Sequence, residues 1–462
     1  MPLLGKKDTE GLNIIIVGCG KVGSTLIAQL IKEGHDITII DTNSAKIQEI
    51  TNLYDVMGVN GNGASYTVLQ EAGIESADLL IAVTGSDELN MLCCAVAGRS
   101  GCATIARVRT PDYTQEAGYL QEKLGLAMII NPELEAATEA ARILGMPSAI
   151  EIDSFAHGQA ELVKVKIEEG NELAGKTLSS LDRKRTESIL ICGVEREGEV
   201  IIPSGNFRIE AGDKVSVLGT HKSVRGFMGY IGMRSHAVRN TLIIGGGKAT
   251  YYLATQLINM GIEVKIIERD KARCEELSIL LPKAIIIHGD GSDEDLLKEE
   301  GLETCDSFVP LTGIDEENVM LTLHAKQVSN CKVITKINRI NFTYVINNLD
   351  LGSVIYPKYI TAEEIIAYVR AKKNSIGSSN IETLYHLFEH NAEAIEFRVR
   401  DNNEVTNTPL MDLHIKKDML VSCINRAGKI IIPRGHDTIQ PGDTVVVITT
   451  DTGIKDITDI LA

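Results

Sequence analysis

Residues 13–41 read NIIIVGCGKVGSTLIAQLIKEGHDITIID, and the fold follows from this stretch. The apolar run at residues 14–17 predicts a strand that is buried on both faces. A helical pattern with one apolar face comes next and stops at Gly34. A second apolar run then leads to Asp41. A strand, a helix and a strand in this order indicate a βαβ unit with parallel strands.

The loop between the first strand and the helix is Gly18-Cys19-Gly20-Lys21-Val22-Gly23. We expect Gly18 to permit the tight turn, Gly20 to let the backbone approach a pyrophosphate, and Gly23 to allow close helix–strand packing. The helix N-terminus offers free N–H groups to a phosphate. Asp41 is placed to accept the ribose hydroxyls and would repel a 2′-phosphate, which favours NAD or an adenine nucleotide over NADP. The alternative is a Rossmann turn that packs but binds nothing.

Further strands and helices alternate up to residue 131. Strands are predicted at residues 56–59, 79–83 and 104–108, and helices at residues 44–53, from residue 90, and at residues 113–124. A second glycine-rich loop, Asn60-Gly61-Asn62-Gly63, follows the third strand. Five or six parallel strands with intervening helices predict a doubly wound sheet.

The pattern then restarts after residue 238. The stretch from Asn240 to Gly247 repeats the stretch from Asn13 with an offset of 227, and Glu268 takes the place of Asp41. Further on, Thr312-Gly313 repeats Thr84-Gly85. Agreement at many separate positions indicates two Rossmann units in one chain.

Each Rossmann domain is followed by a smaller module of short β runs. The turn Glu210-Ala211-Gly212-Asp213 of the first module is matched by Gln440-Pro441-Gly442-Asp443 in the second. The predicted fold class is α/β: two doubly wound parallel-sheet Rossmann domains alternate with two small α+β domains. The predicted boundaries are 12–131 (Rossmann), 132–150 (connecting helix), 151–232 (small domain), 238–356 (Rossmann), 357–375 (connecting helix) and 380–462 (small domain).

Composition excludes several classes of protein. The net charge of −17 over 462 residues argues against nucleic acid as a partner and against direct adhesion to anionic lipid. No apolar run approaches the roughly 20 residues that span a bilayer, and the N-terminus lacks the apolar centre of a signal peptide. The nine cysteines show no CxxC spacing, so we expect reduced thiols and no metal site. We expect no catalytic residue.

Several motifs together resemble the TrkA family, the peripheral subunits of bacterial Trk potassium uptake systems with tandem RCK (also called KTN) domains. In the first half the motifs are GCGKVG at 18–23 with Asp41, NGNGA at 60–64, VTGSDELNM at 83–91 and IARVRTPDY at 105–113. In the second half they are GGGK at 245–248 with Glu268, HGDGSDEDLL at 288–297 and LTGIDEENVM at 311–320. The resemblance covers nearly the whole chain.

The resemblance implies a homo-oligomeric ring, usually a tetramer, on the cytoplasmic face of a potassium-translocating membrane subunit in the plasma membrane. NAD(H) or ATP/ADP would bind the first module, bias the shape of the ring and gate the pore, without insertion of the chain into the membrane. By this resemblance the nucleotide contacts are Gly18, Cys19, Gly20, Lys21, Val22, Gly23, Asp41, Thr84, Gly85 and Arg107. Arg107 is also a suitable cation for a phosphate, with a surface or interface arginine as the alternative.

The second site departs from this pattern. Its candidate contacts are Gly245, Gly247 and Glu268, but Thr250 stands at the third glycine position and two tyrosines follow it. We expect Thr250 to keep the helix slightly away from the strand. The second site is therefore expected to bind nucleotide more weakly, with another selectivity, or not at all.

Two other functions remain open from sequence. An NAD-dependent oxidoreductase would need a substrate domain that supplies a positioned acid or base, and the small modules offer no convincing candidate. A pure assembly scaffold would hold the nucleotide as a static structural cofactor. Identical membrane currents with NADH, NAD, ATP and ADP would favour the scaffold.

Overall fold

The computed structural model describes residues 11–146, 148–155, 159–233, 237–338, 346, 349–376, 381–387, 391–451, 454 and 456–462. The N-terminal residues that bear on the signal-peptide expectation and parts of the second connecting segment lie outside the described residues. The chain divides into two compact units. The Rossmann unit comprises Met1–Ala140 and Asn240–Ile366, and the small-domain unit comprises Ala141–Arg239 and Ala367–Ala462.

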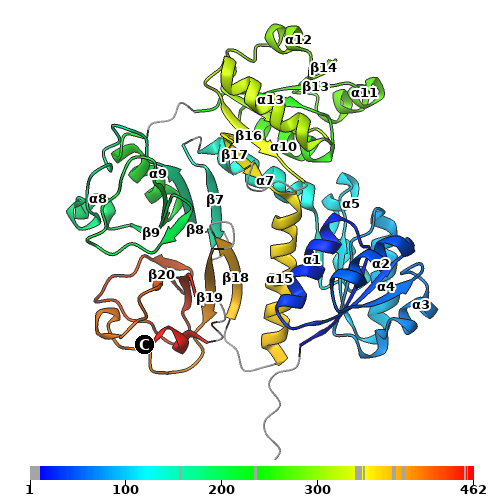
Figure 1. The fold of residues 1–462 in the computed structure, drawn as a ribbon, viewed down its shortest axis with the longest axis horizontal. Coiled ribbons are helices and arrows are strands. Elements are labelled where there is room, and N and C mark those ends of the chain that lie inside the picture. The colour runs from blue at the N-terminus through cyan, green and yellow to red at the C-terminus, as the bar shows by residue number, and fades with distance from the viewer. Residues whose placement is uncertain are drawn as a thin grey trace, which may run out of the picture. The chain divides into compact units, whose positions relative to one another are not determined.

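The first half of the Rossmann unit, drawn from blue to cyan in Figure 1, contains a six-stranded parallel sheet. Its order is β3-β2-β1-β4-β5-β6, which is the doubly wound order expected of a Rossmann domain. The strands are β1 (Asn13–Val17), β2 (Asp36–Asp41), β3 (Met57–Asn60), β4 (Leu79–Ala82), β5 (Ala103–Arg107) and β6 (Met128–Ile130). The four side chains of β4 are all buried, because helices cover both faces of the sheet.

Helices connect these strands in the predicted places, with two differences. The helices are α1 (Lys21–Lys32), α2 (Ser44–Leu53), α3 (Tyr66–Glu71), α4 (Asp87–Ala97), α5 (Pro111–Gln115), α6 (Ala117–Leu124) and α7 (Pro132–Gly145). Helix α4 begins at Asp87, three residues earlier than predicted, because the Ser86 hydroxyl accepts the amide of Leu89 and caps the helix. The single helix predicted at residues 113–124 is two helices, which are separated at Glu116.

The second half of the Rossmann unit repeats this architecture with the strand order β14-β13-β12-β15-β16-β17. The strands are β12 (Asn240–Ile244), β13 (Glu263–Glu268), β14 (Ile285–His288), β15 (Ser307–Pro310), β16 (Lys332–Lys336) and β17 (Ser353–Ile355). The helices are α10 (Lys248–Asn259), α11 (Lys271–Leu280), α12 (Glu294–Glu299), α13 (Asp315–Val328) and α15 (Pro357–Ile376). The internal repeat therefore corresponds to two copies of one fold.

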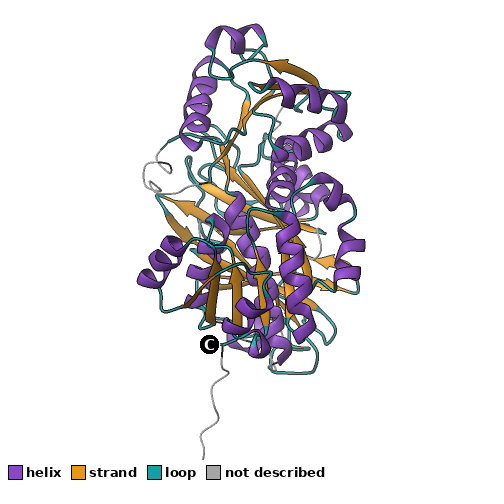
Figure 2. Ribbon diagram, turned by 90° about the vertical axis from the view of Figure 1, so that its right-hand side faces the viewer, coloured by secondary structure: helices purple, strands orange, loops and turns teal. Residues whose placement is uncertain are grey.

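The small-domain unit contains two antiparallel five-stranded sheets, ordered β10-β9-β11-β8-β7 and β18-β19-β22-β20-β21. The first has β7 (Glu151–Phe155), β8 (Ala160–Lys166), β9 (Ile189–Arg196), β10 (Glu199–Ile201) and β11 (Lys214–Gly219), with helices α8 (Arg183–Thr186) and α9 (His221–Tyr230). The second has β18 (Ile381–Leu387), β19 (Ala392–Arg398), β20 (Met419–Arg426), β21 (Lys429–Ile431) and β22 (Thr444–Thr449). Figure 2 shows the strands of both units in orange.

Both small sheets contribute to one hydrophobic core. Buried residues of the first sheet such as Phe155 and Cys192 belong to the same cluster as Cys423 and Val446 of the second. Burial of apolar surface between the sheets stabilises the pair, so neither sheet has a solvent-exposed inner face there. The sequence analysis assigned no strand to residues 128–130, 151–155 or 381–387, which form the edge strands β6, β7 and β18.

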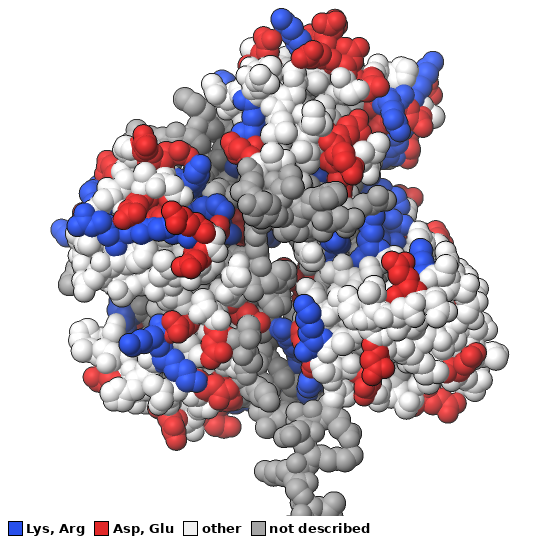
Figure 3. Space-filling view, in the orientation of Figure 1, with Lys and Arg blue, Asp and Glu red and all other residues white. Residues whose placement is uncertain are grey.

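The surface of the chain is mixed in charge. Acidic and basic side chains are interspersed on the face shown in Figure 3. Among the described residues, no helix has both the length and the apolar character needed to cross a bilayer. The same part of the chain contains no group of three or more His, Cys, Asp or Glu side chains that could hold a metal ion.

Candidate functional site

The first glycine loop joins β1 to α1 at the carboxyl edge of the first sheet. Gly18 has a φ of +105°, and its amide donates to the carbonyl of Ile40 at 2.8 Å. A Cβ at Gly23 would lie 2.0 Å from the carbonyl oxygen of Gly18. A Cβ at Gly20 would meet nothing within 4 Å. The tight turn and the close packing predicted for Gly18 and Gly23 are confirmed, and Gly20 faces open space.

The carboxylate of Asp41 lies beside this loop. One of its oxygens accepts the amide of Cys19 at 2.7 Å, and the other accepts the amide of Asn43 at 2.8 Å. Each carboxylate oxygen can accept a second hydrogen bond, so both remain available to vicinal hydroxyls. The side chain is held in place before any ligand arrives.

Other residues of the loop act through the backbone or stay neutral. Val22 is buried, so its side chain belongs to the core, whereas Lys21 is exposed at the first turn of α1. Burial, reinforced by the charge of Asp41, raises the pKa of the Cys19 thiol to about 12. The thiol is thus protonated at neutral pH and is a poor nucleophile.

Thr84 and Gly85 follow β4 at the same edge of the sheet. The side-chain oxygen of Asn90 accepts the amide and the hydroxyl of Thr84 at 2.8 and 2.7 Å, while its Nδ2 donates to the carbonyl of Arg107 at 2.9 Å. Asn90 is fully buried and ties the ends of β4 and β5 together. Sequence analysis quoted Asn90 only as part of a repeated motif, and its recurrence as Asn318 was the available signal. A Cβ at Gly85 would meet nothing within 4 Å.

Arg107 is the last residue of β5 and lies at the same carboxyl edge of the sheet. One guanidinium nitrogen donates to the carbonyl of Thr84, but the buried Nε has no hydrogen-bond partner among the described residues. A buried donor without a partner costs about 1–3 kcal/mol, which an anionic ligand would recover. Burial, followed by the neighbouring Arg109, lowers the pKa of the guanidinium, which still leaves it charged.

Asp87 anchors the loop that follows β5. Its carboxylate accepts the amides of Arg109 and Thr110 at 3.0 and 2.9 Å and the Thr110 hydroxyl at 2.7 Å. Burial by itself would raise the pKa of this carboxyl, but these hydrogen bonds together outweigh it and hold the pKa below its usual value. Sequence analysis missed this anchoring role.

The second glycine loop has a different local packing. Gly245 has a φ of +96°, and Gly247 faces open space. The hydroxyl of Thr250 donates to the carbonyl of Gly245 at 2.5 Å, which is the counterpart of the Gly18 carbonyl. A Cβ is present at Thr250, whereas a Cβ at Gly23 would collide with the Gly18 carbonyl, so the two copies differ in the packing of helix and loop.

Glu268 lies beside the second loop in the same way as Asp41 lies beside the first. Its oxygens accept the amides of Gly246 at 2.5 Å and Asp270 at 2.7 Å. However, the Nε of Arg273 donates to the Gly246 carbonyl at 2.6 Å, and a Cβ at Gly246 would lie 2.7 Å from Leu277. Arg273 and Leu277 were not identified from the sequence, and they fill space beside the second loop.

Helix α10 of the second copy contacts the first copy within the Rossmann unit. The Tyr252 hydroxyl donates to the carbonyl of Arg109 at 2.8 Å, lies 2.9 Å from the Thr114 hydroxyl and accepts from Asn131 at 3.1 Å. Lys248 donates to the Thr110 hydroxyl at 3.0 Å. Of the two tyrosines that follow Thr250, Tyr252 therefore docks onto the loop after β5.

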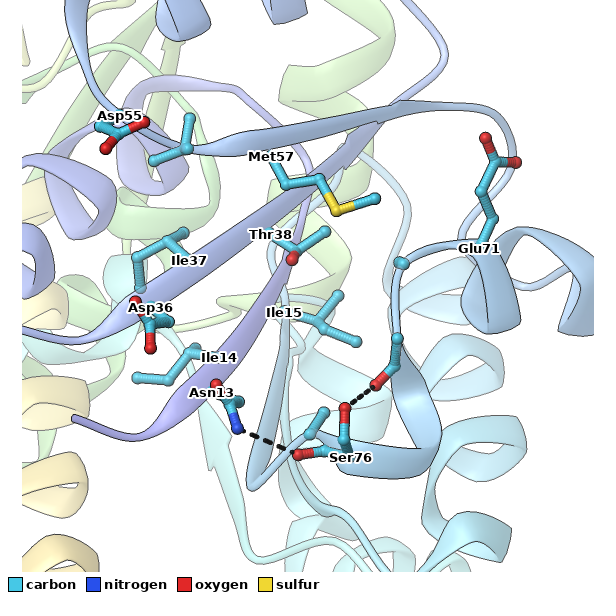
Figure 4. Close-up of a pocket in the computed structure, with 14 residues that line it drawn as sticks. Asn13, Ile14, Ile15, Asp36, Ile37, Thr38, Asp55, Met57, Glu71 and Ser76 are labelled. Atoms are coloured by element: carbon cyan, nitrogen blue, oxygen red, sulfur yellow. Dashed lines mark hydrogen bonds between the residues drawn. The ribbon is translucent and has the colours of Figure 1, made fainter. Parts of the chain in front are cut away.

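A separate cavity of about 420 Å³ lies at the amino ends of β1, β2 and β3. Figure 4 shows its lining, in which the side-chain Nδ2 of Asn13 donates to the carbonyl of Ser76 at 3.3 Å. Open parallel sheets bind their ligands at the carboxyl ends of the strands, where the glycine loop lies. This cavity is at the opposite edge and is not part of the candidate site.

The chain matches two kinds of known domain, each of them twice. Residues 14–132 and 241–357 match the TrkA-N domain, and residues 162–232 and 394–462 match the TrkA-C domain. The Trk system potassium uptake protein TrkA of Haemophilus influenzae is 32% identical over 449 residues, which cover 95% of this chain and 96% of that protein. Its homolog in Archaeoglobus fulgidus is 31% identical over 450 residues, or 97% and 100% of the two chains.

Among solved structures, the GsuK channel bound to NAD has a TM-score of 0.62 at 18% identity, over 96% of this chain and 78% of that one. That likeness concerns the fold alone. The two TrkA-N domains coincide with the two parallel sheets, and the TrkA-C domains lie in the two antiparallel ones. On these matches, the chain belongs to the TrkA family.

Proposed function

We propose that this chain is the nucleotide-binding regulatory subunit of a Trk-type potassium uptake system. NAD(H) or ATP/ADP binds the first Rossmann domain, residues 12–131, and shifts the conformation of a ring that gates a potassium-translocating membrane subunit from its cytoplasmic side. The proposal rests on the placement of Gly20, Asp41 and Arg107 after β1, at the end of β2 and at the end of β5, all at the carboxyl edge of the first sheet. Within the described part of the chain, the buried Nε of Arg107 has no hydrogen-bond partner.

The residues present fit a nucleotide in three respects. The backbone at Gly20 is open to a diphosphate, and the N-terminus of α1 supplies unpaired amides. Asp41 retains acceptor capacity for ribose hydroxyls. Membership of a family whose relatives are named potassium uptake proteins supports the transport role.

Nucleotide binding is tested by titrating the full chain with NADH, NAD, ATP and ADP in a calorimeter. Asp41→Ala removes a charged acceptor, so affinity is expected to fall about 10- to 150-fold. Asp36→Ala is the matched control, because Asp36 is exposed at the other end of the same strand. Equal affinities of wild type and Asp41→Ala, with both proteins folded by thermal melting, would refute the site.

Gating is tested by potassium flux through liposomes that contain the membrane subunit and this chain. A ligand shifts a conformational equilibrium only by its different affinity for two states, so at least one pair of nucleotides must give different fluxes. Asp41→Ala should abolish that difference and leave the flux without nucleotide unchanged. Identical fluxes with all four nucleotides would instead support the static scaffold.

We propose that the chain acts without catalysing hydride transfer. The Cys19 thiol next to the loop is protonated, and the other close side chains are fixed by hydrogen bonds within the fold. Steady oxidation of NADH by the purified chain with small carbonyl substrates would overturn this and favour the oxidoreductase alternative.

For the second Rossmann domain, residues 238–356, we propose weaker or absent nucleotide binding. Arg273 and Leu277 occupy space beside the Gly246 backbone, and Thr250, in place of a glycine, donates its hydroxyl to the Gly245 carbonyl. The binding stoichiometry measured in the same calorimeter should be one per chain at micromolar nucleotide. Glu268→Ala should leave the affinity of that single site unchanged.

A further inference from the structure

Two cysteines lie next to each other at the amino edge of the second Rossmann sheet. Cys305 precedes β15 and Cys331 precedes β16, and these parallel strands pair with Ser307 opposite Lys332. The amide of Lys332 donates to the carbonyl of Asp306 at 2.9 Å, which fixes the spacing of the two chain segments just before they enter the sheet. Both cysteine side chains pack against the same buried cluster of the second Rossmann sheet.

The surroundings of the pair differ from those of the other cysteines. Both side chains are partly exposed, whereas the remaining seven cysteines are buried. The Ser329 hydroxyl donates to the sulfur of Cys331 at 3.0 Å, and the Cys305 thiol also contacts the carbonyl of Leu302 at 3.4 Å. The sulfur of Cys331 therefore accepts a hydrogen bond from Ser329, and a hydrogen bond to the charged form favours a thiolate.

The surroundings shift the pKa values of the two thiols in opposite directions. The hydrogen bond from Cys305 is the largest influence on Cys331; burial opposes it, and the Ser329 hydroxyl and the Lys326 ammonium assist it, lowering the pKa of Cys331 to about 7. The pKa of Cys305 is raised by its hydrogen bond to Cys331, by burial and by the carboxylate of Asp306.

We propose that Cys305 and Cys331 form a dithiol site that is oxidised by low-molecular-weight disulfides, with Cys331 as the attacking and Cys305 as the resolving residue. The Cys331 thiolate attacks one sulfur of the small disulfide, whose S–S bond breaks and releases one thiolate. Cys305 then gives its proton to solvent, attacks the Cys331 sulfur and expels the second thiol. Two cysteine thiols become one disulfide while one small disulfide is reduced to two thiols.

The backbone geometry permits this bond. Adjacent strands are about 4.8 Å apart, and disulfides form between Cα atoms separated by about 4.4–6.8 Å. The two cysteines lie within one residue of the register set by Ser307 and Lys332. A disulfide between the two cysteines, which pack against the same cluster, therefore fits the spacing of the two strands.

The first Rossmann domain provides an internal comparison. The strand β4 corresponds to β15 with an offset of 228 and β5 to β16 with an offset of 229, so the equivalent positions are Ala77 and Cys102. Cys102 is buried at 7% exposure, and the residue in the place of Cys305 has no sulfur. The dithiol is thus a property of the second domain, and it lies at the edge of the sheet opposite Glu268.

The test exposes the reduced full chain to buffers of increasing oxidised-to-reduced glutathione ratio, followed by alkylation and peptide mass spectrometry. The expected product links the peptides that contain Cys305 and Cys331, with the loss of two of nine titratable thiols. Oxidation first at another cysteine, or both thiols remaining open to alkylation at every ratio, would overturn the proposal.

Single variants separate the two roles. Cys305→Ser should stop the reaction at a mixed disulfide of glutathione with Cys331, and Cys331→Ser should prevent both products at this site. Cys102→Ser is the matched control and should behave as the wild type. Formation of a mixed disulfide at Cys305 in the Cys331→Ser chain at the wild-type rate would contradict the assigned order of attack.

A measurement on the unmodified chain removes any dependence on the folding of variants. The rate of iodoacetamide alkylation at Cys331, followed by peptide mass spectrometry, should rise with pH around a midpoint near 7. An ordinary thiol titrates near 8.5, so a midpoint there would contradict an activated Cys331.

Discussion

The three glycines of the first loop have different neighbours, which separates their roles. A Cβ at Gly23 would overlap the Gly18 carbonyl, whereas a Cβ at Gly20 would enter open space. Gly18 needs its positive φ for the turn itself. The same sequence motif thus contains two residues that serve the fold and one that serves the ligand.

This difference predicts opposite outcomes for two similar substitutions. Gly23→Ala should destabilise the chain by about 1–3 kcal/mol, because the new methyl group overpacks the helix–loop contact. Gly20→Ala should change stability by less than about 1 kcal/mol yet weaken nucleotide binding, because its methyl group projects to where a pyrophosphate would lie. Thermal melting and nucleotide titration of both variants check this. A loss of affinity without a loss of stability in Gly23→Ala would contradict it.

Arg107 supports a second prediction about the first site. Arg107→Gln removes the charged donor, so nucleotide affinity should fall about 10- to 150-fold. Lys336→Gln is the control, because Lys336 ends β16 in the second domain and donates to the carbonyl of Leu311 at 2.9 Å. An unchanged nucleotide dissociation constant in Arg107→Gln would mean that Arg107 is an interface residue, the alternative left open by its sequence.

Helix α10 differs from its counterpart α1 in the side chains near its N-terminus and in what they contact. Where α1 has Ser24 and Thr25, α10 has Tyr251 and Tyr252, and Tyr252 is buried against the loop after β5. The first turn of this helix therefore connects the two Rossmann domains. Arg109 and Thr110 of the first domain are therefore in direct contact with helix α10 of the second.

The Tyr252 hydroxyl should be worth about 1–3 kcal/mol of stability. Tyr252→Phe leaves the carbonyl of Arg109 without this donor and Asn131 without this acceptor in a buried place. Tyr251→Phe is the matched control, because its hydroxyl makes no hydrogen bond within the described residues. Urea unfolding of both variants measures the difference, and equal stability of the two would refute the role given to Tyr252.

Each small sheet contains the same ion pair. Asp213 accepts the Nε and Nη2 of Arg196 at 2.7 and 2.8 Å, and Asp443 accepts the same two atoms of Arg426 at 2.8 Å. Each aspartate also accepts the amide at the start of its own turn, Glu210 or Gln440. The Gly-Asp turns that repeat in the sequence are thus bidentate anchors between a turn and a long strand.

The Asp213 anchor predicts a pH dependence of stability. Burial would raise the pKa of Asp213, but the hydrogen bonds of Arg196 and of the Glu210 amide together hold it below its ordinary value. A carboxyl with a lowered pKa stabilises the fold above about pH 4 and loses this contribution as the pH falls through the folded-state pKa. Asp213→Asn should lower the free energy of unfolding by about 1–3 kcal/mol at pH 7. In thermal melts at decreasing pH, down to about pH 3, the difference in stability between this variant and wild type should become smaller. A constant difference would contradict this.

Across the whole chain, a duplicated sequence forms two units that each contain one domain from each half. The chain changes unit within α7 and again within α15, so these two helices belong to both units.

Assembly into a ring predicts a surface that excludes water between chains. Leu92 on α4 and Met320 on α13 are equivalent with an offset of 228, and they are 53% and 66% exposed. Light scattering should give a mass of about four chains of 50.2 kDa, and the double variant Leu92→Glu, Met320→Glu should give a smaller assembly. Ile279→Glu on α11 is the control. A wild-type mass of one chain would refute the ring.

Much of the fold could be predicted from local patterns. The doubly wound sheet of five or six parallel strands, the glycine turn, the helices α2 and α7 and the repeat itself depend on residues that lie close together in sequence, or on the spacing of two copies. Strands β7 and β18 escaped prediction because edge strands carry polar residues: Glu151 on β7 pairs with Lys164 across the sheet. The break at Glu116 escaped because both sides have the same helical periodicity.

By itself, the sequence determined the two nucleotide-type folds, the acid beside each glycine loop and the family to which the chain belongs. Only the tertiary structure decided that the Nε of Arg107 is buried without a partner among the described residues, that Tyr252 joins the two Rossmann domains and that Cys305 lies near Cys331. Tyr252 and Arg109 are separated by 143 positions in sequence. Their contact exists only after both sheets have formed, because periodicity and glycine spacing act over a few residues whereas burial selects partners from the whole chain.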